Sequence, residues 1–207
     1  MRVRSNYFMD ASNHRPDNAA DVLAGVMKRA VASVFGAYGL PLQEVPRTGP
    51  PAVSLVALAK EAGLDPPAVG ATISFQGPKL RGELLVASTL EMTMKTRPTA
   101  QRKSVAPGSA AGQIMIRDWI GELANQILGH FKTQSTRTGL SFETGAPMPL
   151  SGHAMALATP KGTNTSMAGF RASGGSVFCW FDINCAPGID VRPAAALSNK
   201  EGELILL

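Results

Sequence analysis

Three polar side chains that could do chemistry lie in one segment, RDWIGELANQILGHF, residues 117–131. Asp118, Glu122 and Asn125 follow one another at spacings of four and three residues, which places them along one side of a helix. Carboxylates accept hydrogen bonds, and a carboxamide both donates and accepts them. Together with Gly129, four residues after Asn125, they form what we call the polar ridge. The polar ridge is either a surface that binds another molecule or the solvated side of an ordinary amphipathic helix.

Two features of the segment that carries the polar ridge do not favour a stable helix. Asp118 and Glu122 are carboxylates four residues apart, and they repel each other by roughly a few tenths of a kcal/mol. Gly121 and Gly129 each cost roughly 1 kcal/mol relative to alanine in a helix interior. A glycine beside polar groups lets another surface approach the backbone closely, which gives a functional reason for this composition. A Glu-x-x-Asn spacing is also common by chance, so it carries little weight alone.

The helix that must position the polar ridge is predicted from about residue 111 to residue 136. Its apolar residues recur at spacings of three and four, the period of a helix that buries one face. Ser109 precedes it as a candidate N-cap, and Gly139 follows as the stop. The residues expected on its buried side are Ile116, Trp119, Ile120, Leu123, Ala124, Ile127, Leu128 and Phe131.

The rest of the chain predicts another helix and several short strands. An apolar stripe predicts a helix over residues 21–38, with Asp17 or Asn18 as its N-cap and Gly39 with Pro41 as its stop. QGPKLR, between two β-prone runs, predicts a hairpin. Strands are expected at 71–75, 82–87, 140–147, 153–159, 176–184 and 201–207, and a short helix at 89–96. This order predicts an α+β fold with helices packed on a mixed, largely antiparallel sheet.

The length and composition predict one globular domain. The chain has 207 residues, of which 44% are hydrophobic, enough for one sizeable core, and it contains no internal repeat. Residues 1–16 are expected to form a flexible N-terminal segment before a single domain over 17–207. Residues 160–175 have the composition of a mobile loop. No run approaches the ~18 apolar residues of a membrane-spanning helix, and no secretory signal is evident, so a cytoplasmic protein without a membrane partner is expected.

The charge and the possible metal ligands exclude some functions. The formal net charge of +5 permits an acidic partner, but the densest basic cluster, residues 95–103, has no interleaved aromatic residues. A solvated loop is therefore favoured there over a nucleic-acid-binding arm. Cys179 and Cys185 are expected to be buried, reduced thiols. The three histidines, His14, His130 and His153, are isolated from other ligands, so no metal site is predicted.

The segment GELANQILG resembles the chemotaxis phosphatases of the CheC, CheX and FliY group. That group carries Asp or Ser, then Glu, then Asn at the spacing of Asp118, Glu122 and Asn125, followed by a proline that corresponds here to Pro147 or Pro149. ISFQGPKLRGELLVAS is similar to the hairpin that precedes the active helix of the family, and GAPMPLSG to the segment that follows it. The likeness spans about residues 68–157. A single Glu-x-x-Asn is typical of the CheX branch.

The resemblance implies a phosphatase that acts on a phosphorylated CheY-like response regulator in chemotaxis or two-component signalling. Asn125 would orient the attacking water, and Glu122 would contact the conserved lysine of the regulator. Asp118, Gly121, Gln126, Gly129 and Pro147 are the expected partner-binding residues, with Asp118 either at the rim of the contact or merely solvated. No cofactor of its own is expected, because the regulator supplies Mg²⁺.

The resemblance also implies a homodimer and leaves catalysis open. Segments 40–67 and 158–175 look longer than a compact family member requires, and they read as loop insertions. The alternative is therefore a non-catalytic CheX-like module that binds a response regulator or a flagellar switch component. A nucleic-acid partner is not predicted.

Overall fold

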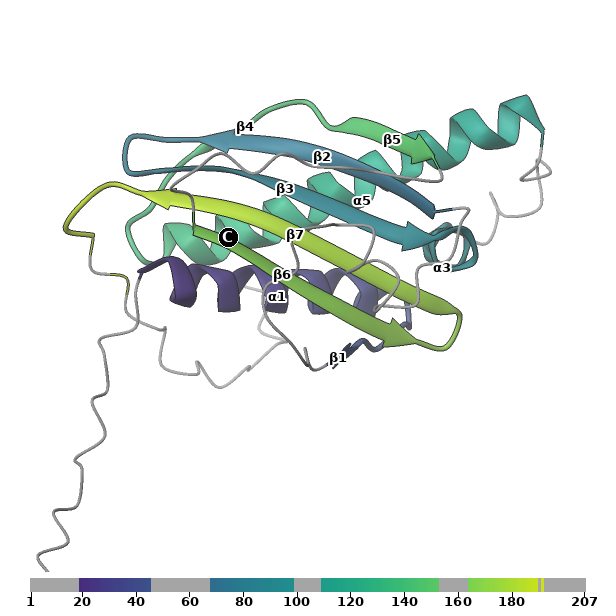
Figure 1. Ribbon diagram of the computed structural model, residues 1–207, viewed down its shortest axis with the longest axis horizontal. Helices are drawn as coiled ribbons and strands as arrows, with labels where there is room; N and C mark the ends of the chain where they lie inside the picture. Colours follow the sequence, from purple (N-terminus) through teal and green to yellow (C-terminus); the bar gives the residue numbers. More distant parts are fainter. Residues whose placement is uncertain (1–18, 46–67, 99–108, 153–163, 190, 192–207) are drawn as a thin grey trace, which may run out of the picture.

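The protein folds as an antiparallel sheet with two long helices side by side on one face (Figure 1). The computed structural model describes residues 19–45, 68–98, 109–152, 164–189 and 191. The helices are α1 (Ala19–Ala37), α3 (Leu90–Thr96) and α5 (Ala110–Thr136). The strands are β1 (Gln43–Val45), β2 (Ala68–Gln76), β3 (Leu80–Thr89), β4 (Glu143–Thr144), β5 (Met148–Gly152), β6 (Asn164–Ala172) and β7 (Gly175–Cys185). The predicted α+β class is confirmed.

The described strands form one sheet in the order β1-β6-β7-β3-β2-β4, and β5 also pairs with β2. Every pairing is antiparallel. The predicted hairpin is confirmed, because β2 and β3 pair along their length and Gly77 donates its backbone N–H to the Leu80 carbonyl at 2.7 Å. The predicted short helix is also confirmed as α3, whose N-cap is Thr89.

The main core lies between the sheet and the pair α1 and α5, which run antiparallel to each other (Figure 1). Alternate residues of each central strand point into it, as the two-residue period of a strand requires. Three phenylalanines, Phe75, Phe131 and Phe142, meet there with ring centroids 5.1 to 5.7 Å apart. The opposite face of β7 is buried as well, at Phe178 and Trp180. The continuous apolar run of residues 177–181 fits a strand that is buried on both faces.

Segment 160–175, expected to be a loop, is largely strand β6, so that prediction is wrong. β6 pairs with β7 over its whole length and with β1 on its other side. Ala168 and Phe170, two residues apart, are buried in the core. The surrounding Gly, Ser and Thr residues hid this alternation, and pairing with two neighbouring strands outweighs their weak strand propensity.

The structure also corrects the strand predicted over residues 140–147. Only Glu143–Thr144 pairs there, and a second strand, β5, starts directly after Pro147. β5 pairs with β2 on one side. A proline can therefore occupy position 149, because the other side of the strand needs no backbone N–H donor. Within the expected insertion 40–67, Gln43–Val45 forms β1. The predictions for residues 1–16, 153–159 and 201–207 lie outside the described residues.

Candidate functional site

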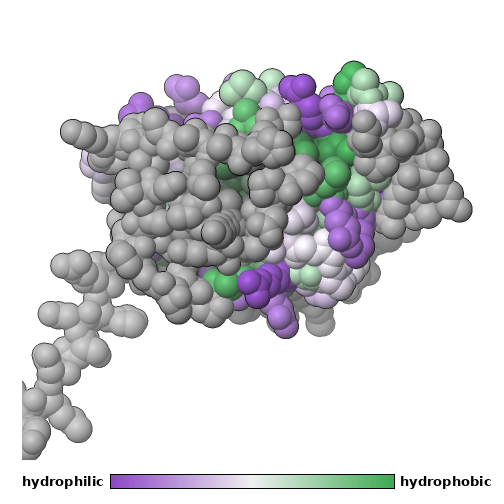
Figure 2. Space-filling view, turned by 45° about the vertical axis from the view of Figure 1, so that its right-hand side comes forward, coloured by the Kyte–Doolittle hydropathy of each residue, from purple (hydrophilic) through white to green (hydrophobic). Residues whose placement is uncertain are grey.

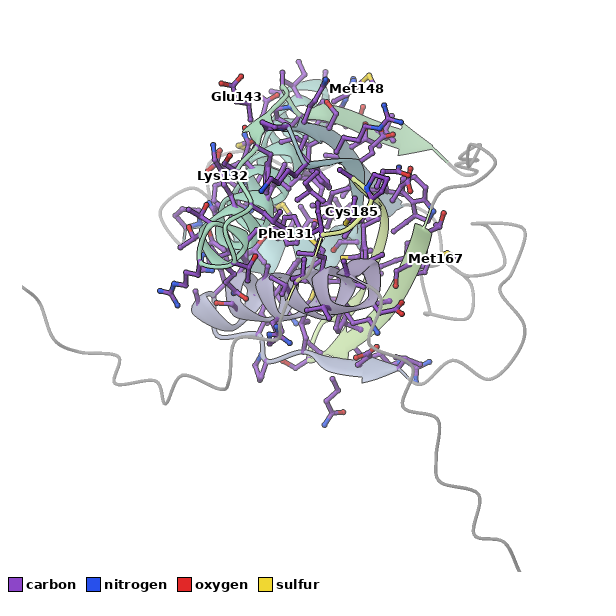
Figure 3. The ribbon with its side chains drawn as sticks, turned by 90° about the vertical axis from the view of Figure 1, so that its left-hand side faces the viewer. Phe131, Lys132, Glu143, Met148, Met167 and Cys185 are labelled. Carbon is purple, nitrogen blue, oxygen red and sulfur yellow. The ribbon has the colours of Figure 1, made fainter. Side chains whose placement is uncertain are left out.

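Helix α5 is the platform of the site. The side-chain oxygen of Ser109 accepts a hydrogen bond from Gly112 N at 3.1 Å, which confirms the predicted N-cap. After the helix, Gly139 adopts φ +77°, a left-handed conformation in which glycine has no Cβ penalty. The predicted buried side is confirmed, except that Trp119 is only partly buried. Figure 3 shows this division near the end of the helix, where Phe131 points into the interior and Lys132 away from it.

The polar ridge lies on the outer side of α5, as the spacing predicts. Asp118, Glu122 and Gly129 are exposed, and Asn125 is partly buried. Glu122 and Asn125 lie one helical turn apart, so a single partner surface can reach both side chains. At Gly129 an added Cβ would meet nothing within 4 Å, so the backbone there is open to approach.

The carboxylate of Glu122 is held by a neighbour that the sequence assigned to the partner contact. Gln126 Nε2 donates to Glu122 Oε1 at 3.1 Å. The hydroxyl of Tyr38, at the end of α1, donates to Gln126 Oε1 at 2.9 Å. Gln126 is partly buried. These contacts occupy both ends of the Gln126 amide inside the chain.

Tyr38 is itself held by aromatic packing. Its ring lies edge-on to Trp119, with centroids 6.0 Å apart and an interplanar angle of 73°. Trp119 Nε1 donates to Thr96 Oγ1 at 2.8 Å, and the Thr96 hydroxyl donates to the Thr93 carbonyl at 2.7 Å. The side of the polar ridge nearest α1 therefore rests on contacts that reach α3.

Gly121 has a different neighbour from the one expected. It is buried, and a Cβ added there would lie 3.5 Å from Pro147 Cβ and Cγ and 3.9 Å from Pro149 Cγ. The prediction that Gly121 gives a partner room is therefore wrong, because the room is filled by prolines of the same chain. Both candidate prolines lie against this glycine, with Pro147 the closer. Pro147 is itself partly buried.

The side chains of Glu122 and Asn125 can bind a partner and orient a water molecule. Glu122 can accept hydrogen bonds from a cationic group, and the Asn125 amide can both donate to and accept from one water.

Among the described residues, no group of three or more His, Cys, Asp and Glu side chains could hold a metal ion. Both cysteines are free thiols; Cys179 is buried, as predicted, whereas Cys185 is only partly buried. In that part of the chain, no helix is both long and apolar enough to span a membrane.

Few large hydrophobic side chains are exposed among the described residues. On the face drawn in Figure 2, the described hydrophobic residues form small areas interrupted by hydrophilic side chains. Ile114 and Met148 are the large hydrophobic residues exposed among those described.

Sequence reasoning missed Tyr38 as part of the site. The residue counted as one more member of the apolar stripe of the first helix, and 88 positions separate it from Gln126. The one available signal was chemical, because a tyrosine at the end of an apolar stripe carries a hydroxyl that needs a partner when it is buried.

Solved structures define the class of fold. CheX of Vibrio vulnificus matches with a TM-score of 0.61 and 15% identity, over 81% of this chain and 99% of that chain. A CheC-like superfamily protein of Shewanella sp. PV-4 matches with a TM-score of 0.61 and 16% identity, over 79% and 97% of the two chains. A chain in a CheX-CheY-BeF3-Mg²⁺ complex of Borrelia burgdorferi matches with a TM-score of 0.56 and 13% identity, over 81% of this chain and 99% of that chain. The fold is therefore that of CheC-like proteins.

The family follows from the sequence. The family model described as "Chemotaxis phosphatase CheX" matches residues 69–171, which include β3, α5 and most of β2 and β6. This chain is a CheX-like member of the CheC/CheX/FliY family. No curated protein matches the chain.

Proposed function

We propose that this protein is a phosphatase that removes the phosphoryl group from the aspartate of a CheY-like response regulator. The observation that carries the proposal is the presentation of Glu122 and Asn125, one turn apart, on the outer side of α5. The family match and the CheX-CheY complex of the Borrelia protein support a regulator as the partner.

The reaction needs an oriented water and little else from the phosphatase. Water attacks phosphorus in line as the bond from phosphorus to the aspartate oxygen breaks, and the products are a free carboxylate and inorganic phosphate. Asn125 would accept one hydrogen bond from that water and fix its direction of attack. The gain is mainly positional, because the water no longer has to find the in-line geometry by diffusion.

Glu122 would bind the partner. Its exposed carboxylate can accept from a lysine of the regulator, and such a charge-assisted contact sets the register between two proteins. The phosphatase would bring no metal of its own, since the regulator carries Mg²⁺ beside its phosphorylated aspartate. Asp118 and Gly129 would lie at the contact, and the protein would act as a homodimer.

The test is the decay of a phosphorylated CheY-like regulator, followed with wild-type protein and two variants. Asn125→Ala is expected to lower kcat about 100-fold, because the water loses its orientation. Glu122→Ala is expected to raise KM about tenfold, because a charge pair with the regulator is lost. The matched controls are Gln113→Ala and Glu143→Gln. Gln113 is an exposed residue elsewhere on α5, and Glu143 carries an exposed carboxylate on β4.

Two other results would redirect the proposal. If the wild-type protein binds the regulator without changing its decay, the protein is a binding module for that regulator. If Asn125→Ala retains full activity, the water is oriented by another group and the assignment of Asn125 is wrong. Sedimentation of the purified protein tests the homodimer.

A further inference from the structure

Two hydrogen bonds link the end of α1 to the exposed carboxylate of the polar ridge. Tyr38 donates to Gln126 Oε1 at 2.9 Å, and Gln126 Nε2 donates to Glu122 Oε1 at 3.1 Å. The first contact joins residues 88 positions apart, whereas the second joins neighbours on successive turns of α5. The exposed carboxylate is thus connected to a partly buried hydroxyl.

The direction of these bonds fixes the Gln126 amide. A carboxylate only accepts hydrogen bonds, so the NH₂ group of Gln126 must face Glu122. The carbonyl group then faces Tyr38, which donates its O–H. A tyrosine hydroxyl can both donate and accept, so it is the carboxylate that dictates which way the Gln126 amide faces. Tyr38 adds a second hydrogen bond, which holds Gln126 in the orientation in which its NH₂ group donates to Glu122.

Tyr38 is well placed to do this because its own ring cannot move freely. It packs edge-on against Trp119, whose indole N–H is bonded to Thr96. Glu122 has three rotatable side-chain bonds and is exposed, so a partner would otherwise have to order it on binding. Gln126 holds one carboxylate oxygen, and the other can accept from a cationic group.

We propose that Gln126 and Tyr38 are positioning residues for Glu122, which hold its carboxylate in the orientation that binds a cationic group on the regulator. This inference rests on the proposed function. It changes the role of Gln126 from a partner contact to a residue that acts through Glu122, and it gives Tyr38 a role in a site on another helix. Supporting shells of this kind commonly orient the groups that touch a ligand.

A purely structural role is the alternative. Tyr38 and Gln126 could simply join α1 to α5, and a Gln–Glu pair at this spacing adds little to helix stability. Tyr38→Phe separates the two roles, because it keeps the ring against Trp119 and removes only the hydroxyl. Gln126→Met keeps a long unbranched side chain and removes the amide. Gln113→Met makes the same change at an exposed position of α5 and is the control.

The experiment measures KM and kcat for decay of the phosphorylated regulator, and Kd for the beryllofluoride-loaded regulator. Tyr38→Phe and Gln126→Met are each expected to raise KM and Kd about fivefold, the effect of losing one ordering hydrogen bond. The value of kcat should stay within about twofold, since loss of uniform binding leaves it unchanged. Gln113→Met should behave as wild type.

A double-mutant cycle gives the decisive readout. In a Glu122→Ala background, Tyr38→Phe and Gln126→Met should have no further effect on KM or Kd, because the group they position is gone. A further increase there would overturn the inference. So would wild-type values for both single variants when Glu122→Ala is impaired. If the wild-type protein neither binds the regulator nor speeds its decay, the proposed function itself fails, and this inference falls with it.

The side-chain amide of Gln126 provides a check that needs no regulator. Its ¹H–¹⁵N resonances in the free protein should shift and exchange faster with water after Tyr38→Phe, and they should also shift after Glu122→Ala. Resonances that stay unchanged in both variants would show that the two hydrogen bonds do not form, and that result would overturn the inference.

Discussion

Gly121 of α5 lies against Pro147, at a distance where an added Cβ would be 3.5 Å from the ring of the proline. Pro149, two residues further on, approaches the same point to 3.9 Å. The segment that leads into β5 thus crosses α5 directly beside the polar ridge, one turn before Asn125. Gly121 gives this crossing segment room, while Gly129, two turns further along, faces open space.

Gly121→Ala is expected to stabilise the protein. The new methyl group would sit in ordinary van der Waals contact with Pro147, and alanine has a higher helix propensity than glycine by about 1 kcal/mol. The free energy of unfolding in urea should rise by about 0.5 to 1 kcal/mol. Gly121→Leu should instead lower it by about 1 to 3 kcal/mol, because the larger side chain collides with the prolines. Equal destabilisation by both variants would contradict the observed spacing.

Gly129→Ala separates stability from partner binding. It should also raise the free energy of unfolding by about 0.5 to 1 kcal/mol, since the methyl group enters open space. If the regulator approaches the α5 backbone here, as the proposed function implies, the same variant should raise KM in the phosphate-decay assay. A more stable protein with an unchanged KM would show that this glycine does not serve the contact. Gly121→Ala is the natural comparison, because its methyl group is covered by Pro147.

The two long helices could be predicted from the sequence because each buries one continuous stripe. The three- and four-residue spacing in α1 and α5 reflects packing on a single sheet, and the caps at Ser109 and Gly139 are local interactions. β7 could be predicted as well, because its middle, residues 177–181, is an uninterrupted apolar run, which is typical of a strand buried on both faces.

β6 could not be predicted for the opposite reason. Its polar and glycine residues are held in a strand by hydrogen bonds to β1 and β7, which lie elsewhere in the sequence. Contacts between residues far apart in the sequence also decide the arrangement of the site. The sequence places Glu122, Asn125 and Gln126 on one helix, but only the packing of α1 on α5 brings Tyr38 to Gln126. The covering of Gly121 by Pro147 likewise depends on where β5 pairs with β2.

The stability of the protein should fall as the pH rises above about 8.5, partly because of Cys179. Burial raises the pKa of its thiol far above the ordinary range, and burial also raises the pKa of the partly buried Cys185. In the unfolded chain a thiol ionises near pH 8.5. Above that pH the unfolded state loses a proton that the folded state keeps, so ionisation favours unfolding. For Cys179 the contribution is complete below about pH 8.5 and declines by about 1.4 kcal/mol per pH unit above it, as long as the folded thiol keeps its proton.

Cys179→Ala tests whether ionisation of this thiol causes the loss of stability at alkaline pH. The variant should start less stable at neutral pH, because a buried side chain is truncated, but its free energy of unfolding should fall less steeply between pH 8.5 and 10. Urea unfolding at a series of pH values measures both slopes under reducing conditions. Cys185→Ala should flatten the curve less, because the folded thiol there is only partly buried. Parallel curves for wild type and Cys179→Ala would mean that other groups, such as lysine or tyrosine side chains, cause the alkaline loss.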